Sequence, residues 1–215
     1  MAEQRPADFW ETHYGAVDRV WSGRPNTAVV DVAGGLPPGR VLDLGCGEGG
    51  DAVWLAGRGW DVTAVDISPT AVDRGRAAAA AAGVAVRFVV ADLTTWEPDA
   101  SYDLVTASFL QSPVALTRGE ILRRAAARVV TGGHVLLVSH AAPPPWAHHH
   151  DGPSRLLTPS EELAELALPD GWEVVLAESR TREVDGPDGA PAVLEDSVVL
   201  VRRVSGPATT AAAPT

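Results

Sequence analysis

The stretch Arg40–Ser68, RVLDLGCGEGGDAVWLAGRGWDVTAVDIS, decides the fold of this chain. It begins with a short apolar run, Val41–Leu44, which we interpret as a buried strand, and a glycine cluster follows at once. From about Gly49 the apolar residues fall on one face of a helix, and a second strand is expected over Asp61–Val65. This order predicts a βαβ unit with parallel strands.

The same alternation continues after this unit. Ser68 is a typical helix N-cap with Pro69 at the first helical position, and the alanine-rich helix that follows should run to Ala82 and stop at Gly83. Three further apolar runs predict strands at positions 84–90, 102–107 and 134–139. Alternating strands and helices are typical of a parallel sheet with helices on both faces, which binds ligands at the carboxyl ends of its strands.

Two capping-box patterns predict helices in the second half of the chain. The box at 117–120 predicts a helix to about Val130, which the glycines at 132 and 133 should end. The box at 158–161 contains a proline and predicts a helix to about Leu168.

The last two apolar segments, 172–178 and 193–204, predict consecutive strands, hence a hairpin with one antiparallel strand. We expect one domain over residues 1–204, in which residues 1–38 form an N-terminal arm, and a disordered tail over 205–215.

Composition narrows the class of protein. The chain has 215 residues, of which 46% are hydrophobic, enough for one domain with a full core. A formal net charge of −11 makes nucleic acid a poor partner. No signal pattern precedes the domain and no apolar run approaches the ~20 residues of a membrane span. The single cysteine, Cys46, offers no disulfide and suits the cytoplasm.

The glycine cluster indicates a nucleotide-like ligand. Gly45, Gly47 and Gly50 form G-x-G-x-x-G between a strand and a helix, and Asp66 follows 21 residues after Gly45, where a carboxylate can accept both hydroxyls of a ribose. Asp43, two residues before the first glycine, would repel a pyrophosphate but attract an ammonium group. A ligand with a ribose, an amino group and a carboxylate fits this loop, and S-adenosylmethionine is such a ligand.

A third acid agrees with this interpretation. Asp92 ends the third predicted strand and could accept a hydrogen bond from an adenine amino group, while Ile67 and Leu93 pack against the ring. Three acids after three neighbouring strands fit one ligand that lies across the sheet.

These segments resemble the class I S-adenosylmethionine-dependent methyltransferases, whose glycine-rich, ribose-binding and adenine-binding motifs are similar to VLDLGCGEG, VTAVDIS and VVADLTTW. The resemblance covers roughly Arg40 to His140. It implies a Rossmann-like three-layer sandwich with a seven-stranded, mostly parallel sheet. It also implies cofactor contacts from Asp43, Gly45, Cys46, Gly47, Asp66, Ile67, Ser68, Ala91, Asp92, Leu93, Ser108 and Phe109, the last two reaching toward the methyl group.

The N-terminal arm holds a dense aromatic group, Trp10, Tyr14 and Trp21. These rings could simply dock a helix on the domain, or they could form a lid that attracts a sulfonium cation and excludes water. The segment resembles the tryptophan-bearing arm of the tellurite-resistance and thiopurine methyltransferases. That resemblance adds Tyr14, Trp21 and Ser22 to the cofactor-binding residues.

No motif identifies a catalytic residue. His140 ends a strand at the reactive edge of the sheet and His13 lies on the arm, so both are candidates for a general base. The cluster His148–His150 could be an exposed loop, a substrate lid or, least favoured, a metal site, and we predict no metal. Cys46 is expected to contribute backbone contacts rather than a reactive thiol.

The resulting prediction is a cytoplasmic methyltransferase, a monomer or homodimer, that moves a methyl group to a small molecule by in-line displacement and releases S-adenosyl-L-homocysteine. It would bind neither nucleic acid nor membrane. Two alternatives remain open. An NAD-type oxidoreductase shares the glycine spacing but leaves Asp43 and Asp92 unexplained. A non-catalytic relative would bind the cofactor without transferring a methyl group.

Overall fold

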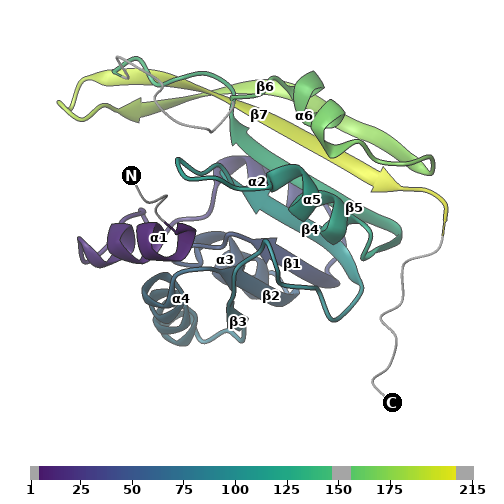
Figure 1. Ribbon diagram of the computed structural model, residues 1–215, viewed down its shortest axis with the longest axis horizontal. Coiled ribbons are helices and arrows are strands. Elements are labelled where there is room, and N and C mark those ends of the chain that lie inside the picture. The colour runs from purple at the N-terminus through teal and green to yellow at the C-terminus, as the bar shows by residue number, and fades with distance from the viewer. Residues whose placement is uncertain (1–4, 147–155, 207–215) are drawn as a thin grey trace.

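A seven-stranded sheet in the order β3-β2-β1-β4-β5-β7-β6 forms the centre of the computed structural model, which describes residues 5–146 and 156–206 (Figure 1). Its strands are β1 (Arg40–Leu44), β2 (Asp61–Asp66), β3 (Arg87–Val90), β4 (Tyr102–Ser108), β5 (Val129–His140), β6 (Trp172–Asp185) and β7 (Pro191–Arg203). The first five strands pair in parallel, and β7 runs antiparallel to both β5 and β6. The predicted fold class, with its single antiparallel strand, is confirmed.

Helices cover both faces of the sheet. They are α1 (Pro6–Gly15), α2 (Thr27–Ala33), α3 (Gly50–Gly57), α4 (Pro69–Ala82), α5 (Arg118–Ala126) and α6 (Pro159–Leu166). One core contains side chains of α2, α3 and α4, and the other contains side chains of α5 and α6. Strand β1 shows why both layers form, because Val41 and Leu42 are fully buried on opposite faces. Among the described residues, no helix has the length and apolar character needed to cross a bilayer.

The predicted ends of helix α4 are confirmed. The Ser68 hydroxyl accepts a hydrogen bond from the Ala71 N–H at 3.1 Å, and Gly83 ends α4 with a φ of 68°. The strand predicted from position 84 begins only at Arg87, because the Val84 N–H binds the Ala79 carbonyl at 3.0 Å as part of the helix terminus.

The second half departs from the prediction at α5. Thr117 makes no side-chain cap, so the box at 117–120 is wrong, whereas the box at 158–161 is confirmed. The helix ends at Ala126 rather than near Val130, because Val129 is fully buried and pairs with Tyr102 as the first residue of β5. The glycines at 132 and 133 lie inside this strand, beside a register shift, rather than ending a helix.

The hairpin at the end of the sheet is longer than the sequence suggested. Strand β6 continues to Asp185, beyond the predicted end at Glu178, and it stays paired with β7 as far as Pro191. Figure 1 shows this hairpin extending past the rest of the sheet, on the side where α1 lies. Of the predicted tail, residues 207–215 lie outside the described residues.

A buried ion pair joins α5, α6 and β5. The Arg118 guanidinium donates to both carboxylate oxygens of Glu162, at 2.8 and 3.1 Å, and to the Ser139 hydroxyl at 2.9 Å. The Glu162 side chain is 1% exposed and that of Arg118 is 10% exposed. A more exposed carboxylate, Glu165, lies 3.4 Å from the same guanidinium.

We predict that Glu162→Ala lowers the free energy of unfolding by about 3–5 kcal/mol, because it leaves a buried guanidinium without its partner. Chemical denaturation would measure the change. Glu165→Ala, on the same helix and against the same arginine, is the control and should cost less than about 1 kcal/mol. Equal losses in the two variants would contradict this account.

Candidate functional site

A cleft of about 900 Å³ lies at the carboxyl ends of the parallel strands, between α1 and the β6–β7 hairpin. The strand order reverses direction there, because β1 pairs with β2 on one side and with β4 on the other. Loops leave such a switch point to opposite faces of the sheet, and the gap between them receives a ligand.

The glycine loop forms the floor of this cleft. Gly45 and Gly47 both have left-handed backbone, with φ of 67° and 52°, which a side chain would disfavour. Space is short as well, since a Cβ at Gly47 would lie 2.9 Å from the Tyr14 hydroxyl and one at Gly45 2.7 Å from Leu110. The loop therefore presents bare backbone to the cleft.

Asp43 carries an unsatisfied carboxylate oxygen beside this loop. Its side chain lines the cleft and is 2% exposed, and Oδ1 accepts a hydrogen bond from the Thr106 hydroxyl at 2.9 Å. Oδ2 is buried without a hydrogen-bond partner among the described residues. Burial, and next the neighbouring Asp51 carboxylate, raise the pKa of Asp43 to about 8, against the opposing effect of Thr106. A cationic ligand group would satisfy Oδ2.

Asp66 joins the glycine loop to the start of α4. Its Oδ2 accepts the Gly47 N–H at 2.8 Å and its Oδ1 accepts the Ser68 N–H at 2.9 Å. Burial raises the pKa of Asp66, although these N–H groups oppose the change. The side chain also lines the cleft. Each oxygen retains a lone pair, so fixing the backbone does not prevent Asp66 from binding ligand hydroxyls.

The third acid lies farther along the same edge. The Asp92 Oδ1 accepts the N–H and hydroxyl of Thr94, at 2.8 and 2.6 Å, and the side chain lines the cleft with Ile67 and Leu93. The lining also includes Cys46, Ser108 and Phe109.

Two residues proposed to contact the cofactor have other positions. Ser68 is fully buried, and its hydroxyl contacts α1 and the start of α4, outside the cleft lining. Ala91 is likewise outside the lining. Burial, and next the charges of Asp66 and Asp43, raise the pKa of the Cys46 thiol, which stays protonated near neutral pH.

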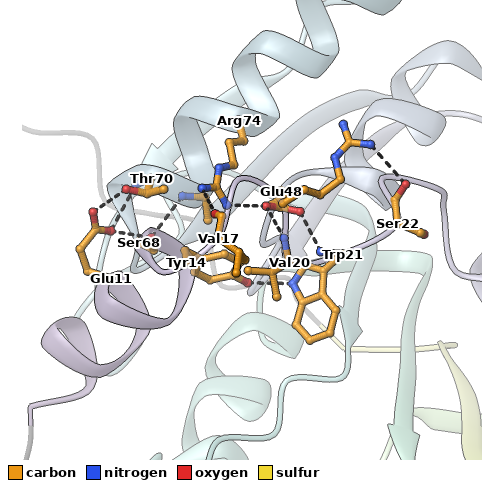
Figure 2. Close-up of polar contacts among 12 residues, drawn as sticks. Glu11, Tyr14, Val17, Val20, Trp21, Ser22, Glu48, Ser68, Thr70 and Arg74 are labelled. Atoms are coloured by element: carbon orange, nitrogen blue, oxygen red, sulfur yellow. Dashed lines mark hydrogen bonds and ion pairs between the residues drawn. The ribbon is translucent and has the colours of Figure 1, made fainter. Parts of the chain in front are cut away.

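The N-terminal arm is fastened across the glycine loop at two points (Figure 2). At the first, the Glu11 carboxylate of α1 accepts the Ser68 hydroxyl at 2.6 Å, the Thr70 N–H at 3.2 Å and the Thr70 hydroxyl at 2.5 Å. These hydrogen bonds hold the pKa of Glu11 below its ordinary value, although burial acts in the opposite direction. Glu11 thus extends the cap of α4 from a different helix.

The second point of attachment is Glu48, in the glycine loop. Its carboxylate, 5% exposed, accepts the N–H groups of Val20 and Trp21 at 3.1 and 3.0 Å. Arg74 of α4 pairs with it at 2.8 Å and donates to the Val17 carbonyl at 2.6 Å. Figure 2 shows these bonds converging on the arm from the loop and from the helix. Sequence spacing gave no signal for Glu48 or Arg74.

The aromatic residues of the arm are divided between the domain surface and the cleft. Tyr14, on α1 of the arm, is 4% exposed, and its hydroxyl accepts the Trp21 Nε1–H at 3.1 Å. Burial raises its pKa, so the phenol remains neutral. Trp21 is 53% exposed and lines the cleft, as do Trp10 and Ser22. The arm is therefore docked on the domain and also forms one wall of the cleft.

The opposite wall contains His140. Its imidazole stacks on Phe109, with ring centroids 4.2 Å apart, and its Nδ1 lies 3.1 Å from Oδ1 of Asp196 in β7. Phe109 has a φ of 53°, a strained backbone that is often found at functional sites. Arg182 of β6 completes the wall and binds the other oxygen of Asp196 at 2.6 Å. Asp196 and Arg182 were not among the predicted site residues.

The remaining histidines do not join this wall. His13 is exposed on α1, among the rings of the arm, and is outside the cleft lining. The cluster His148–His150 lies outside the described residues. Within 5–146 and 156–206, no group of three histidine, cysteine or acidic side chains is placed to hold a metal ion.

A family model matches the part of the chain that contains the glycine loop, and a sequence relative matches about half of the chain. The family model, described as a methyltransferase domain, matches residues 41–133. "Probable thiol methyltransferase 2" from Arabidopsis thaliana is 36% identical over 110 residues, which cover 49% of each chain. The chain thus spans about half the length of this curated relative.

Two solved structures resemble nearly the whole described chain. One, titled "Conversion of a Disulfide Bond into a Thioacetal Group during Echinomycin Biosynthesis", has a TM-score of 0.72 and 26% identity, with 92% of both chains covered. TehB from Haemophilus influenzae has a TM-score of 0.68 over 90% of this chain and 66% of its own, and its 19% identity supports the fold alone.

We predict that Glu48→Ala releases the arm. The variant removes three hydrogen bonds to a carboxylate, so opening the segment that contains Val20 and Trp21 should become easier by about 1.5–3 kcal/mol. Hydrogen exchange followed by mass spectrometry would show faster exchange of these amides. Asp8→Ala, which removes only an exposed pair with Arg5 on the same arm, is the control and should leave exchange unchanged. Unchanged exchange in Glu48→Ala would show that the arm does not depend on this carboxylate.

Proposed function

We infer that this chain, which belongs to the class I S-adenosylmethionine-dependent methyltransferases, transfers a methyl group to a small-molecule acceptor by in-line displacement. The observation that carries the proposal is the buried Asp43 Oδ2, which has no partner among the described residues and lies beside the bare glycine loop. An amino-acid ammonium group supplies the cation that this oxygen lacks.

The other acids fit the rest of the same cofactor. Asp66 would accept the ribose hydroxyls and Asp92 the adenine amino group, with Ile67 and Leu93 against the ring. Gly45 and Gly47 line the same cleft and would contact the methionine portion through their backbone. When bound, S-adenosylmethionine supplies a methyl group on a positively charged sulfur, which is electrophilic without help from a metal.

The chain's own contribution is to position the reactants and exclude water. The fastened arm covers the glycine loop, and its Trp10 and Trp21 line the cleft, where aromatic rings would favour a cation. Phe109 and His140 form the wall opposite, so an acceptor would lie between this wall and the cofactor. Holding two reactants in line can supply several kcal/mol of the acceleration.

A small acceptor fits the charge of the chain and the name of one similar protein. The net charge of −11 is unfavourable for binding nucleic acid, and the similar protein from Arabidopsis thaliana bears the name of a thiol methyltransferase. An NAD-type oxidoreductase fits less well, because a pyrophosphate beside Asp43 would meet a buried acid instead of an anion-binding group. A cofactor-binding relative without activity is distinguished by a panel of acceptors.

We predict that S-adenosylhomocysteine binds more tightly than NADH in calorimetry, and that Asp66→Ala weakens its binding by about 1–3 kcal/mol. The matched control is Asp61→Ala, at the opposite end of β2, where the side chain is 81% exposed. The control should bind as the wild type does. Tighter binding of NADH, or equal affinity in a correctly folded Asp66→Ala, would argue against the proposed function.

We also predict that the cofactor binds more tightly as the pH rises from about 6 to about 8. The pKa of Asp43 is raised to about 8, so the acid is mostly protonated in the free protein at neutral pH, whereas an ammonium ligand favours the carboxylate. Binding should therefore release part of a proton, which calorimetry in buffers of different ionisation enthalpy measures. Asp43→Asn should bind more weakly and without that release. Proton uptake by the wild type would contradict the assignment.

A further inference from the structure

The wall of the cleft opposite the arm contains a histidine–carboxylate pair that the cofactor contacts do not use. His140 and Asp196 are direct partners in the antiparallel pairing of β5 with β7, so their side chains leave the same face of the sheet. The imidazole is 40% exposed and lines the cleft, whereas Asp196 is 6% exposed behind it. One member of the pair can thus meet a ligand, and the other can only act through it.

The Asp196 carboxylate is satisfied on both oxygens. Oδ1 faces the His140 Nδ1 at 3.1 Å, and Oδ2 accepts the Arg182 Nε–H at 2.6 Å. An ionised carboxylate accepts hydrogen bonds and cannot donate them. The proton between Asp196 and a neutral His140 therefore belongs to Nδ1, and Nε2 remains with a lone pair.

The backbone of His140 is fixed from the other side. The Gln111 side chain accepts the His140 N–H at 2.8 Å and donates to the His140 carbonyl at 3.2 Å, in place of a neighbouring strand. The stacked Phe109 ring restricts rotation of the imidazole. Backbone, ring and Nδ1 each have a partner, an arrangement typical of a residue held for chemistry.

We propose that His140 is the general base of this methyltransferase, that Asp196 is its positioning residue, and that the acceptor is a small thiol or hydroxyl compound bound with its proton. The proposal rests on the methyltransferase function inferred above. The acceptor's S–H or O–H bond breaks and its proton goes to Nε2 of His140. The electron pair of the acceptor atom forms the bond to the methyl carbon, while the pair of the broken carbon–sulfur bond leaves with the sulfur of the donor. Asp196 then pairs with the imidazolium.

Acceptors that differ only in ionisation test this proposal. An alkanethiol and a phenol keep their proton at neutral pH, whereas a nitrothiophenol is already an anion and needs no base. We expect His140→Gln to lower kcat for the two protonated acceptors by about 10²–10⁴-fold and to lower turnover of the nitrothiophenol far less. The two protonated acceptors also separate thiol from hydroxyl substrates. Equal losses for all three acceptors, or no loss for any, would overturn the proposal.

Asp196 needs a measurement that does not depend on activity. Nitrogen NMR of the histidine-labelled protein, with the signal assigned by its absence in His140→Gln, should find the proton of the neutral ring on Nδ1. Asp196→Asn should shift that tautomer and reduce turnover of the protonated acceptors only. A wild-type ring with its proton on Nε2 would refute the pair. His134→Gln, in the middle of β5 and outside the cleft lining, is the matched control and should change neither result.

Calorimetry on the same preparations separates this proposal from the one on which it depends. His140→Gln that still binds S-adenosylhomocysteine, with selective loss toward protonated acceptors, supports both proposals. A wild type that fails to bind S-adenosylhomocysteine would overturn the methyltransferase function itself. Retained binding together with unselective loss of turnover would overturn only the role of His140.

Discussion

The buried carboxylate of Asp66 is the interaction on which the rest of the site depends. It accepts N–H groups from two segments, Gly47 in the loop after β1 and Ser68 at the start of α4. Removing a carboxylate from water is costly, and these donors offset part of that cost while they fix the distance between loop and helix. A rigid loop then gives the arm a surface on which to dock. The shape of the cleft and the docking of the arm thus both depend on the buried side chain of Asp66.

Carboxylates also hold the arm in place. Glu11 and Glu48 are acids that satisfy N–H and hydroxyl groups on segments far from them in the chain, and Arg74 balances the second of them. Such contacts are directional, so the arm can dock in only one register. The exposed Trp21 is consequently held over the glycine loop even though about half of its own surface faces solvent.

The sequence was informative where short-range rules apply. Glycines, an N-cap and acids at strand ends recur at fixed spacings, and parallel strands bring those ends to one edge, so Asp43, Asp66 and Asp92 could be placed in one cleft beforehand. Asp196 could not, because its contact with His140 depends on the register of an antiparallel pair 56 residues apart. At Thr117 a short-range rule predicted a helix cap that does not form. The capping pattern is present, but the Thr117 ψ of 57° is not that of a cap, and the adjacent Arg118 is held instead by Glu162.

Because the β6–β7 hairpin is long, the residues proposed to bind the cofactor and the hairpin residues that line the cleft lie on different strands. The proposed cofactor contacts come from β1, β2 and the loops that follow β3 and β4, whereas Glu183, Val184 and Asp185 reach the cleft from the far end of the hairpin. That end pairs only with itself, so its side chains can change without disturbing the parallel core. Mutational drift in these few positions can therefore yield paralogues that accept different compounds while sharing one donor.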